Sequence, residues 1–267
     1  MTANSDAPMR TQWRGGQFVR NGILGSLSPG DFEHIRPFLQ PVTLKERSVL
    51  QEPNRRIEYV HFVETGLVSL MALASGSILE TAMVGSQGAV PASIALGSST
   101  SSHRSVVLVS GSALRIRSDD LQRSMHERPQ IREHLLHYVH SLMGHCFQTS
   151  LCGVQHHLEQ RLACWLCLVC DALDDDVLPI THDHLSDVLG FRRPTVTDSL
   201  NKLEEQGLIR KLRGVLQVCN RPLLERKACC CYGILSNTYK PAKLPELFGP
   251  ALSAGLAEKS AGDFDHL

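Results

Sequence analysis

The chain has 267 residues, enough for two ordinary domains, and a hydrophobic content of 42% that is sufficient for buried cores. Its formal net charge is zero, which excludes a protein that binds polyanions through overall charge alone. No run approaches the roughly 18 apolar residues of a membrane-spanning helix, and the polar start lacks the apolar core of a signal peptide. We therefore expect a cytoplasmic protein with no membrane partner.

The first half of the chain is predicted to be rich in β-structure. Residues 1–20 are expected to form a flexible arm, and a helix is expected over 29–39, with Ser28 or Asp31 as its cap. Short strands are predicted at 59–63, 67–73, 79–84, 106–109 and 114–116. Several short strands separated by glycine turns indicate a small barrel or sandwich.

A helix capped near Ser118 and then a long helix after Pro129 are expected next. Five side chains of the long helix roughly follow one apolar seam: Ile131, Leu135, Tyr138, Leu142 and Cys146. Two copies of the chain could pair through this seam as a short coiled coil, which would make it a dimer interface. The alternative is a helix that packs only on its own barrel. A very apolar helix over 158–173 follows.

The stretch from 182 to 207 carries the strongest pattern in the chain. Leu185 and Leu189 lie on one side of a short predicted helix, and Gly190 follows where a left-handed C-cap residue is expected. A second helix can begin near Arg193, because Pro194 is tolerated in a first helical turn. Two helices joined by a tight turn that contains glycine are the helix-turn-helix pattern.

Two strands, 208–210 and 215–218, are predicted after the second helix, joined through a basic turn as a β-hairpin or wing. From 182 to 227 there are nine Lys or Arg against six Asp or Glu, a local excess of three in a chain that is neutral overall. A final helix is expected to run from 222 to about 239. The Pro-, Gly- and Ala-rich tail, 240–267, is expected to be disordered.

The second helix of the pair and the wing are the candidate DNA-binding elements. The N-terminal end of a recognition helix meets base edges, whereas basic and hydroxyl side chains hold phosphates. The candidate DNA-binding residues are Arg192, Arg193, Thr195, Thr197, Asp198, Asn201, Lys202, Lys211 and Arg213. The alternative is an ordinary helical hairpin with a solvated basic face.

A β-roll, a long helix and a winged helix-turn-helix, in that order over about 20–230, resemble the Crp/Fnr family of bacterial transcription regulators. The similarity is sharpest in the stretch 181–214, which matches the family's DNA-binding signature in length. Its matching positions are Leu185, Gly190, Val196, Leu203, Gly207 and Ile209. The resemblance implies an α+β fold: a cupin-like, cyclic-nucleotide-binding-like β-roll (21–128), a dimerisation helix (129–157) and a winged helix-turn-helix domain (158–239). It implies a homodimer on a palindromic site in double-stranded DNA, controlled by an effector in the β-roll, and leaves RNA polymerase open as a further partner.

The resemblance does not identify the effector. Cyclic-nucleotide sensors of this family hold the phosphate with an Arg-Ser or Arg-Thr pair and the ribose with a carboxylate. Arg104 and Ser105, with Gly88 in the preceding glycine-containing stretch, are the candidate effector-binding residues. No Asp or Glu occurs between Glu80 and Asp119, so the ribose carboxylate is missing and a cyclic nucleotide is disfavoured.

The nine cysteines all lie after residue 145, which excludes the N-terminal iron–sulfur cluster of the family's oxygen-sensing branch. Cys164, Cys167 and Cys170 recur along one side of the apolar helix and are interpreted as core residues. At most one of Cys229, Cys230 and Cys231 is expected to join a site, because adjacent residues point in different directions. Histidines of the long helix could suit a metal, a haem or a proton switch, but solvated side chains are favoured. No metal ligand and no cofactor is assigned.

The leading hypothesis is therefore a DNA-binding regulator. The alternative is a non-enzymatic ligand or redox sensor whose helix-turn-helix mediates protein contacts. An enzyme is not expected, because the sequence has no nucleophile elbow, P-loop, zinc-protease or dinucleotide motif.

Overall fold

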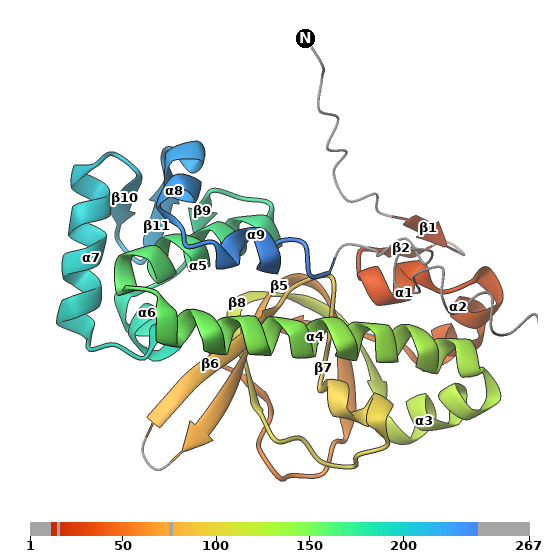
Figure 1. Ribbon diagram of the computed structural model, residues 1–267. Helices are drawn as coiled ribbons and strands as arrows, with labels where there is room; N and C mark the ends of the chain where they lie inside the picture. The colour runs from red at the N-terminus through yellow and green to blue at the C-terminus, as the bar shows by residue number, and fades with distance from the viewer. Residues whose placement is uncertain (1–11, 15–16, 75–76, 240–267) are drawn as a thin grey trace, which may run out of the picture.

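The structure is a computed structural model that describes residues 12–14, 17–74 and 77–239. A β-roll lies below a single long helix, α4 (Pro129–Gln155), and a smaller helical domain lies above the left-hand end of that helix (Figure 1). No helix among these residues is long and apolar enough to cross a membrane. The expected tail, 240–267, and residues 1–11 of the expected arm lie outside the described residues.

The N-terminal segment contains more regular structure than the sequence predicts. Within the expected arm, β1 (Gln12–Arg14) and β2 (Gln17–Val19) pair as an antiparallel hairpin. Two short helices follow, α1 (Gly22–Ser26) and α2 (Pro29–Ile35), and the 3-10 helix η1 (Arg36–Phe38) completes the expected helix over 29–39. The Ser28 hydroxyl accepts a hydrogen bond from the Asp31 backbone N–H, so Ser28 is the cap of α2.

The β-roll is an antiparallel sheet in the order β3-β8-β5-β6, with β4 paired to β8 and β7 paired to β5. The strands are β3 (Gln40–Leu44), β4 (Val49–Gln51), β5 (Tyr59–Ala74), β6 (Ser77–Val84), β7 (Ala89–Val90) and β8 (Arg104–Arg117), with the 3-10 helix η2 (Ala92–Leu96) before β8. In two places the sequence predicts two short strands where the structure has one long strand. Gly66 at φ +83° accounts for the first, because it lies where the β5–β8 register shifts and so is a bulge rather than a turn.

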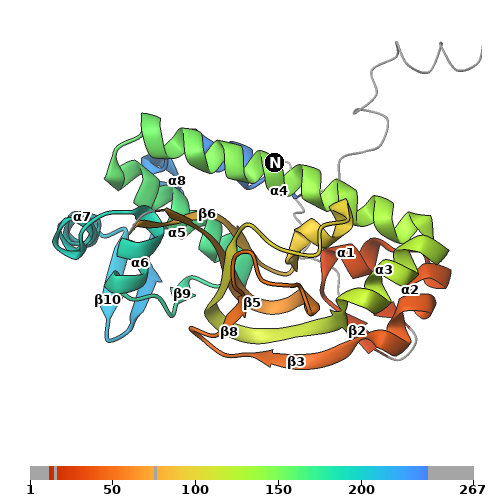
Figure 2. The same ribbon diagram turned by 90° about the horizontal axis from the view of Figure 1, so that it is seen from below.

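Helix α3 (Ser118–Glu127) leads into α4 (Pro129–Gln155), which crosses one face of the roll while β3 lies on the opposite face (Figure 2). The predicted dimer seam is wrong. Ile131, Leu135, Tyr138 and Leu142 are buried in the core of the chain's own β-roll, and Cys146 packs partly buried against the same core. The apolar stripe is present on α4, but it packs against the β-roll of the same chain rather than against a second copy.

The opposite face of α4 carries a second row of apolar side chains. Met143, Phe147, Leu151 and Val154 are exposed, and Phe147 and Val154 keep 68% and 88% of their surface accessible. Their spacing of four, four and three residues places them along one side of the helix. This outer face is therefore an apolar surface of α4 that the described residues leave uncovered.

The C-terminal domain has its own core. Its elements are α5 (Leu158–Leu173), β9 (Val177–Leu178), α6 (His182–Leu189), α7 (Arg193–Glu205), β10 (Ile209–Leu212), β11 (Val215–Val218), α8 (Arg221–Lys227) and α9 (Cys231–Leu235). The strand order is β10-β11-β9, so the predicted wing gains a third strand. The single final helix expected over 222–239 is instead two short helices, broken at 228–230.

The two domains pack directly on each other. Leu67, Met83 and Leu108 of the roll belong to the same buried cluster as Leu162 and Leu166 of α5. The structure thus confirms the predicted fold class, an antiparallel β-roll, a long helix and a winged helix-turn-helix, and adds a shared apolar contact between the two ends.

Candidate DNA-binding surface and effector pocket

Local interactions fix the turn between α6 and α7. The Thr181 hydroxyl caps α6 by accepting from the His184 backbone N–H at 3.3 Å. Gly190 ends the helix at φ +72°, a conformation that only glycine adopts without strain. The Arg161 guanidinium of α5 donates to the Leu189 carbonyl at 3.1 Å and lies over the ring of Phe191. The predicted left-handed C-cap at Gly190 and the turn that follows it are confirmed.

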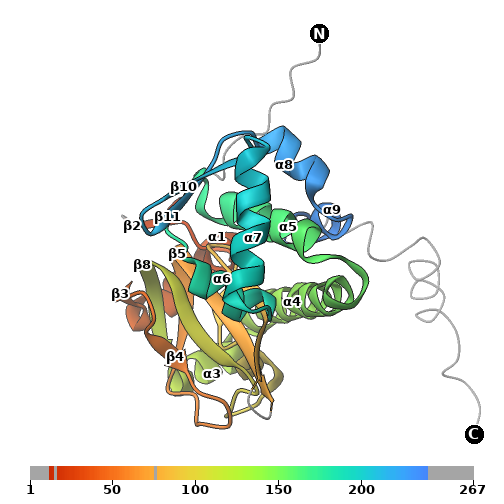
Figure 3. The same cartoon turned by 90° about the vertical axis from the view of Figure 1, so that its left-hand side faces the viewer.

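Helix α7 stands on the outer surface of its domain, with α6 beneath it and the wing beside it (Figure 3). Its apolar stripe, which includes Val196, Leu200 and Leu203, is buried against the domain core. Five of the candidate DNA-binding residues are exposed at its start and along its outer side: Arg192, Arg193, Thr195, Asp198 and Lys202. Arg213 is exposed in the turn of the wing, next to Gly214.

Two of these exposed cations form ion pairs within the protein. Arg193 Nε lies 3.2 Å from Asp183 of α6, and Lys202 Nζ lies 2.5 Å from Glu159 of α5. In both pairs the two side chains are largely exposed. Exposed ion pairs contribute at most about 1 kcal/mol, so exchanging either carboxylate for a polyanion has little energetic cost.

Three other candidates bond within the domain. Thr197 Oγ1 lies 3.0 Å from His182 Nδ1, which ties α7 to α6. Lys211 Nζ donates to the side-chain oxygen of Asn201 and pairs with Glu204 at 2.8 Å. The structure therefore gives these residues contacts that hold the wing and α6 against α7.

Glu204 is the residue of this group that the sequence reasoning missed. Its carboxylate accepts from both the side chain and the backbone N–H of Lys211, and these hydrogen bonds lower the pKa of Glu204. The spacing of seven residues between a helix end and a wing strand gives no local signal of this contact.

The candidate effector residues do not all face one site. Arg104 begins β8 and pairs with Glu52 at 3.2 Å, and Ser105 beside it is buried. Among the described residues, the buried Arg104 Nε and Ser105 Oγ atoms have no hydrogen-bond partner. Gly88 has a packing role instead, because a Cβ there would lie 2.5 Å from the hydroxyl of Tyr138 on α4.

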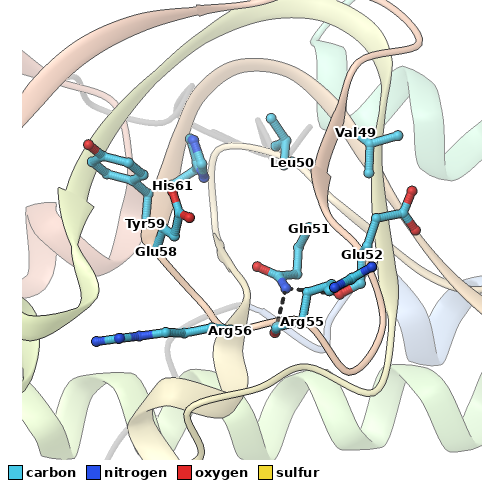
Figure 4. A pocket seen from close by; sticks show the side chains of 9 residues that line it. All are labelled: Val49, Leu50, Gln51, Glu52, Arg55, Arg56, Glu58, Tyr59 and His61. Atoms are coloured by element: carbon cyan, nitrogen blue, oxygen red, sulfur yellow. Dashed lines mark hydrogen bonds between the residues drawn. The ribbon is translucent and has the colours of Figure 1, made fainter.

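A cavity of about 290 Å³ opens beside Glu52, between β4 and the start of β5 (Figure 4). Gln51, on one wall, donates to the backbone carbonyls of Glu52 and Arg55, both at 2.9 Å. Tyr59 and His61 lie on the other wall. Burial and the nearby Arg115 lower the pKa of His61 to about 4, so its ring is neutral near pH 7.

The sequence reasoning missed this cavity because its lining comes from a loop without a recognised motif. The only signal is the density of charge in the segment 52–58, which holds Glu52, Arg55, Arg56 and Glu58 within seven residues. All four line the cavity.

A buried carboxyl group joins the two domains. Glu80 of β6 accepts hydrogen bonds from the indole N–H of Trp165 on α5 at 2.7 Å and from the hydroxyl of Ser69 on β5 at 2.5 Å. Burial raises the pKa of Glu80 to about 7, against the two hydrogen bonds that lower it. A carboxyl engaged in this way is not available to a ligand hydroxyl.

The features above define a class of protein: a winged helix-turn-helix domain attached through a long helix to a β-roll. The segment 160–227 matches the family model described as the Crp-like helix-turn-helix domain. A comparison with curated proteins found no similar sequence.

Solved structures share the whole architecture. A transcriptional regulator of the Crp/Fnr family from Eubacterium rectale aligns with a TM-score of 0.62 at 15% identity, over 78% of this chain and 98% of its own. FixK2 from Bradyrhizobium japonicum aligns with a TM-score of 0.60 at 17% identity, over 72% of this chain and 98% of its own. TTHB099 from Thermus thermophilus, a transcriptional regulator of the CRP family, aligns with a TM-score of 0.60 at 16% identity, over 70% and 96%.

These comparisons confirm the resemblance that the sequence indicated. The chain contains a Crp-like helix-turn-helix domain, and its overall fold is similar to that of solved Crp/Fnr family regulators. The similar proteins from Eubacterium rectale and Thermus thermophilus are described as transcriptional regulators.

Proposed function

We propose that this protein is an effector-controlled regulator that binds a palindromic site in double-stranded DNA as a homodimer. The observation that carries the proposal is the exposed start of α7, where Arg192 and Arg193 project from a helix whose opposite side is buried. Arginine pairs with guanine through two hydrogen bonds in the major groove. Thr195 and Asp198 flank the same edge of the helix.

Lys202 and Arg213, both exposed, would contact phosphates beside a groove filled by α7. Such contacts position the protein on the duplex without reading its sequence. Thr197, Asn201 and Lys211 support the surface by fixing α6 and the wing. In this proposal residues 158–239 bind DNA, 129–157 pair the two chains and 21–128 sense the effector.

The homodimer would form through the outer face of α4. A second copy is the natural cover for the row that contains Met143, Phe147, Leu151 and Val154, because two such rows can pack side by side along a two-fold axis. That symmetry would present two copies of α7 to half-sites about 34 Å apart. RNA polymerase would be a second partner of the bound dimer.

The effector would bind beside β4 and the start of β8. The unpartnered buried atoms of Arg104 and Ser105 favour an anionic group, and the cavity beside Glu52 has room for a small molecule. The Glu80 carboxyl accepts from Trp165, so it would not be available to a ribose hydroxyl. Control requires only that the effector binds one arrangement of the two domains better than the other.

Selection from a random duplex library tests this function. Wild-type protein should enrich an inverted repeat and bind it about a thousandfold or more tightly than unrelated duplexes. Arg192→Ala should lose most of that preference. Arg123→Ala, an exposed arginine of α3 outside the proposed surface, should retain it. Uniform weak binding to all duplexes would refute the proposal.

A further inference from the structure

Four potential metal ligands from two distant parts of the chain meet at one point. Cys152 lies in the last turn of α4 and His156 directly follows that helix, whereas Cys229 precedes α9 and Cys231 begins it. Their ligand atoms all lie within 4.8 Å of one another. The Cys152 and Cys229 sulfurs are 3.4 Å apart, and Cys231 Sγ is 3.7 Å from His156 Nδ1.

These separations match a tetrahedral site. Zinc binds cysteine sulfur at about 2.3 Å and histidine nitrogen at about 2.0–2.1 Å, which places neighbouring donors about 3.5–3.8 Å apart in a tetrahedron. Three sulfurs and one imidazole are also one of the donor sets of closed structural zinc sites. Small rotations of the four side chains would complete the geometry.

An apolar cluster and an amide donor surround the proposed ligands. Cys152, Cys229 and Cys231 are buried in a small apolar cluster with Cys164 and Leu235. The amide of Gln148, one turn before Cys152, donates to the Cys231 sulfur at 3.1 Å. Donors of this kind stabilise a coordinating thiolate from outside the ligand set.

The break between α8 and α9 creates the cluster. In one continuous helix Cys229 and Cys231 would lie on different sides, as the sequence analysis assumed. Residues 228–230 are not helical, so the chain turns there and brings both thiols to the end of α4. Cys230, between them, is exposed and lies 3.7 Å from the other ring nitrogen of His156.

We propose that Cys152, His156, Cys229 and Cys231 form a tetrahedral site for a divalent transition metal ion, with zinc as the ion that fits the donor set best. The ion would join the end of α4 to the segment that follows the wing. Helix α9 packs against both α4 and α5, so the bound ion would fix the direction in which the DNA-binding domain leaves the long helix (Figure 1). This last consequence rests on the proposed DNA-binding function, whereas the site itself does not.

Metal analysis of the full-length protein tests the site. Protein produced with zinc in the medium and purified under reducing conditions should contain one zinc per chain by mass spectrometry. After the zinc is removed, added Co²⁺ should give the absorption of a tetrahedral thiolate complex. Cys229→Ser and His156→Ala should lose the ion, whereas the matched variants Cys230→Ser and Cys170→Ser should retain it.

Several results would overturn the proposal. Wild-type protein that contains no metal and gives no Co²⁺ absorption would do so even if the variants fail to fold. A Cys152–Cys229 disulfide in the reduced preparation would also do so. If His156→Ala retained zinc and Cys164→Ser lost it, the fourth ligand would be Cys164 rather than His156. This result would refute the assigned ligand set.

Duplex binding by the same samples keeps the two proposals apart. Loss of tight operator binding on zinc removal, and its return on zinc addition, is the expected result. A metal-loaded protein without duplex preference would refute the DNA-binding function and leave the metal site supported. Duplex preference in a protein that never holds metal would refute the metal site and leave the DNA-binding function supported.

Discussion

Replacing Glu80 by glutamine should stabilise the protein above neutral pH. Glu80 is fully buried between the two domains, and burial raises its pKa from 4.5 to about 7. This rise in pKa corresponds to about 3 kcal/mol of stability that the folded protein loses when the carboxyl is ionised. Glutamine can accept from Trp165 and donate to Ser69, so Glu80→Gln should preserve both contacts without the charge.

The sign of this effect follows from the direction of the pKa shift. Below about pH 4.5 the carboxyl is protonated in both the folded and the unfolded protein, and its contribution to stability is complete. Between about pH 4.5 and 7 only the unfolded chain releases the proton, so the wild-type protein loses stability as the pH rises. Above pH 7 the loss is complete.

Urea unfolding of wild type and Glu80→Gln, followed by circular dichroism at several pH values from 5 to 8, measures this difference. Glu80→Gln should gain up to about 3 kcal/mol relative to wild type at pH 8 and much less at pH 5. Trp165→Phe keeps the carboxyl and loses one donor, so it should be less stable but keep the pH dependence. A stability difference between wild type and Glu80→Gln that does not change with pH would refute the reasoning.

Three further predictions follow from the same structure. Phe147→Glu should convert a dimer into a monomer in light scattering while Leu73→Glu, an equally apolar exposed site on β5, should not; a monomeric wild type would contradict the dimer proposal. Gly88→Ala should lower the free energy of unfolding by about 1–3 kcal/mol, because its Cβ would overlap Tyr138 and Val84, and an unchanged urea midpoint would contradict this packing. Arg213→Ala should reduce the slope of log affinity against log salt by about one with base preference intact, and lost base preference would show that Arg213 does more than hold a phosphate.

The helix-turn-helix could be predicted almost to the residue because its signals are local. Thr181 caps α6, Gly190 ends it, and Pro194 lies in the first turn of α7. Each helix boundary is therefore marked by a residue at or next to it. The exposed arginines follow from the same helical spacing. Their ion pairs with Asp183 and Glu159 depend on neighbouring helices and could not be read from the pattern.

The dimer seam shows where the pattern was insufficient. The spacing of Ile131, Leu135 and Leu142 predicts an apolar stripe on α4 but not what covers it, and the covering surface is the chain's own roll. The long strand β5 was divided in two for a related reason, because Gly66 can be either a turn or a bulge until its partner strand is known.

The thiol cluster could not be predicted because its members are far apart in the sequence. Cys152 and Cys229 are separated by 77 positions, and their meeting depends on the break after α8. Adjacent cysteines in an assumed helix led to the opposite expectation. The cavity beside Glu52 was missed for a different reason, since its lining residues are close in sequence but carry no recognised motif.

Discrimination between single base pairs by α7 tests the central claim most directly. Fluorescence anisotropy should compare wild type and Arg193→Ala on the selected duplex and on duplexes changed at one base pair in each half-site. Wild type should lose about tenfold to a hundredfold in affinity at the position that Arg193 reads, and Arg193→Ala should bind the original and the changed duplex alike. Equal discrimination by both proteins at every position would show that α7 does not read DNA through this residue.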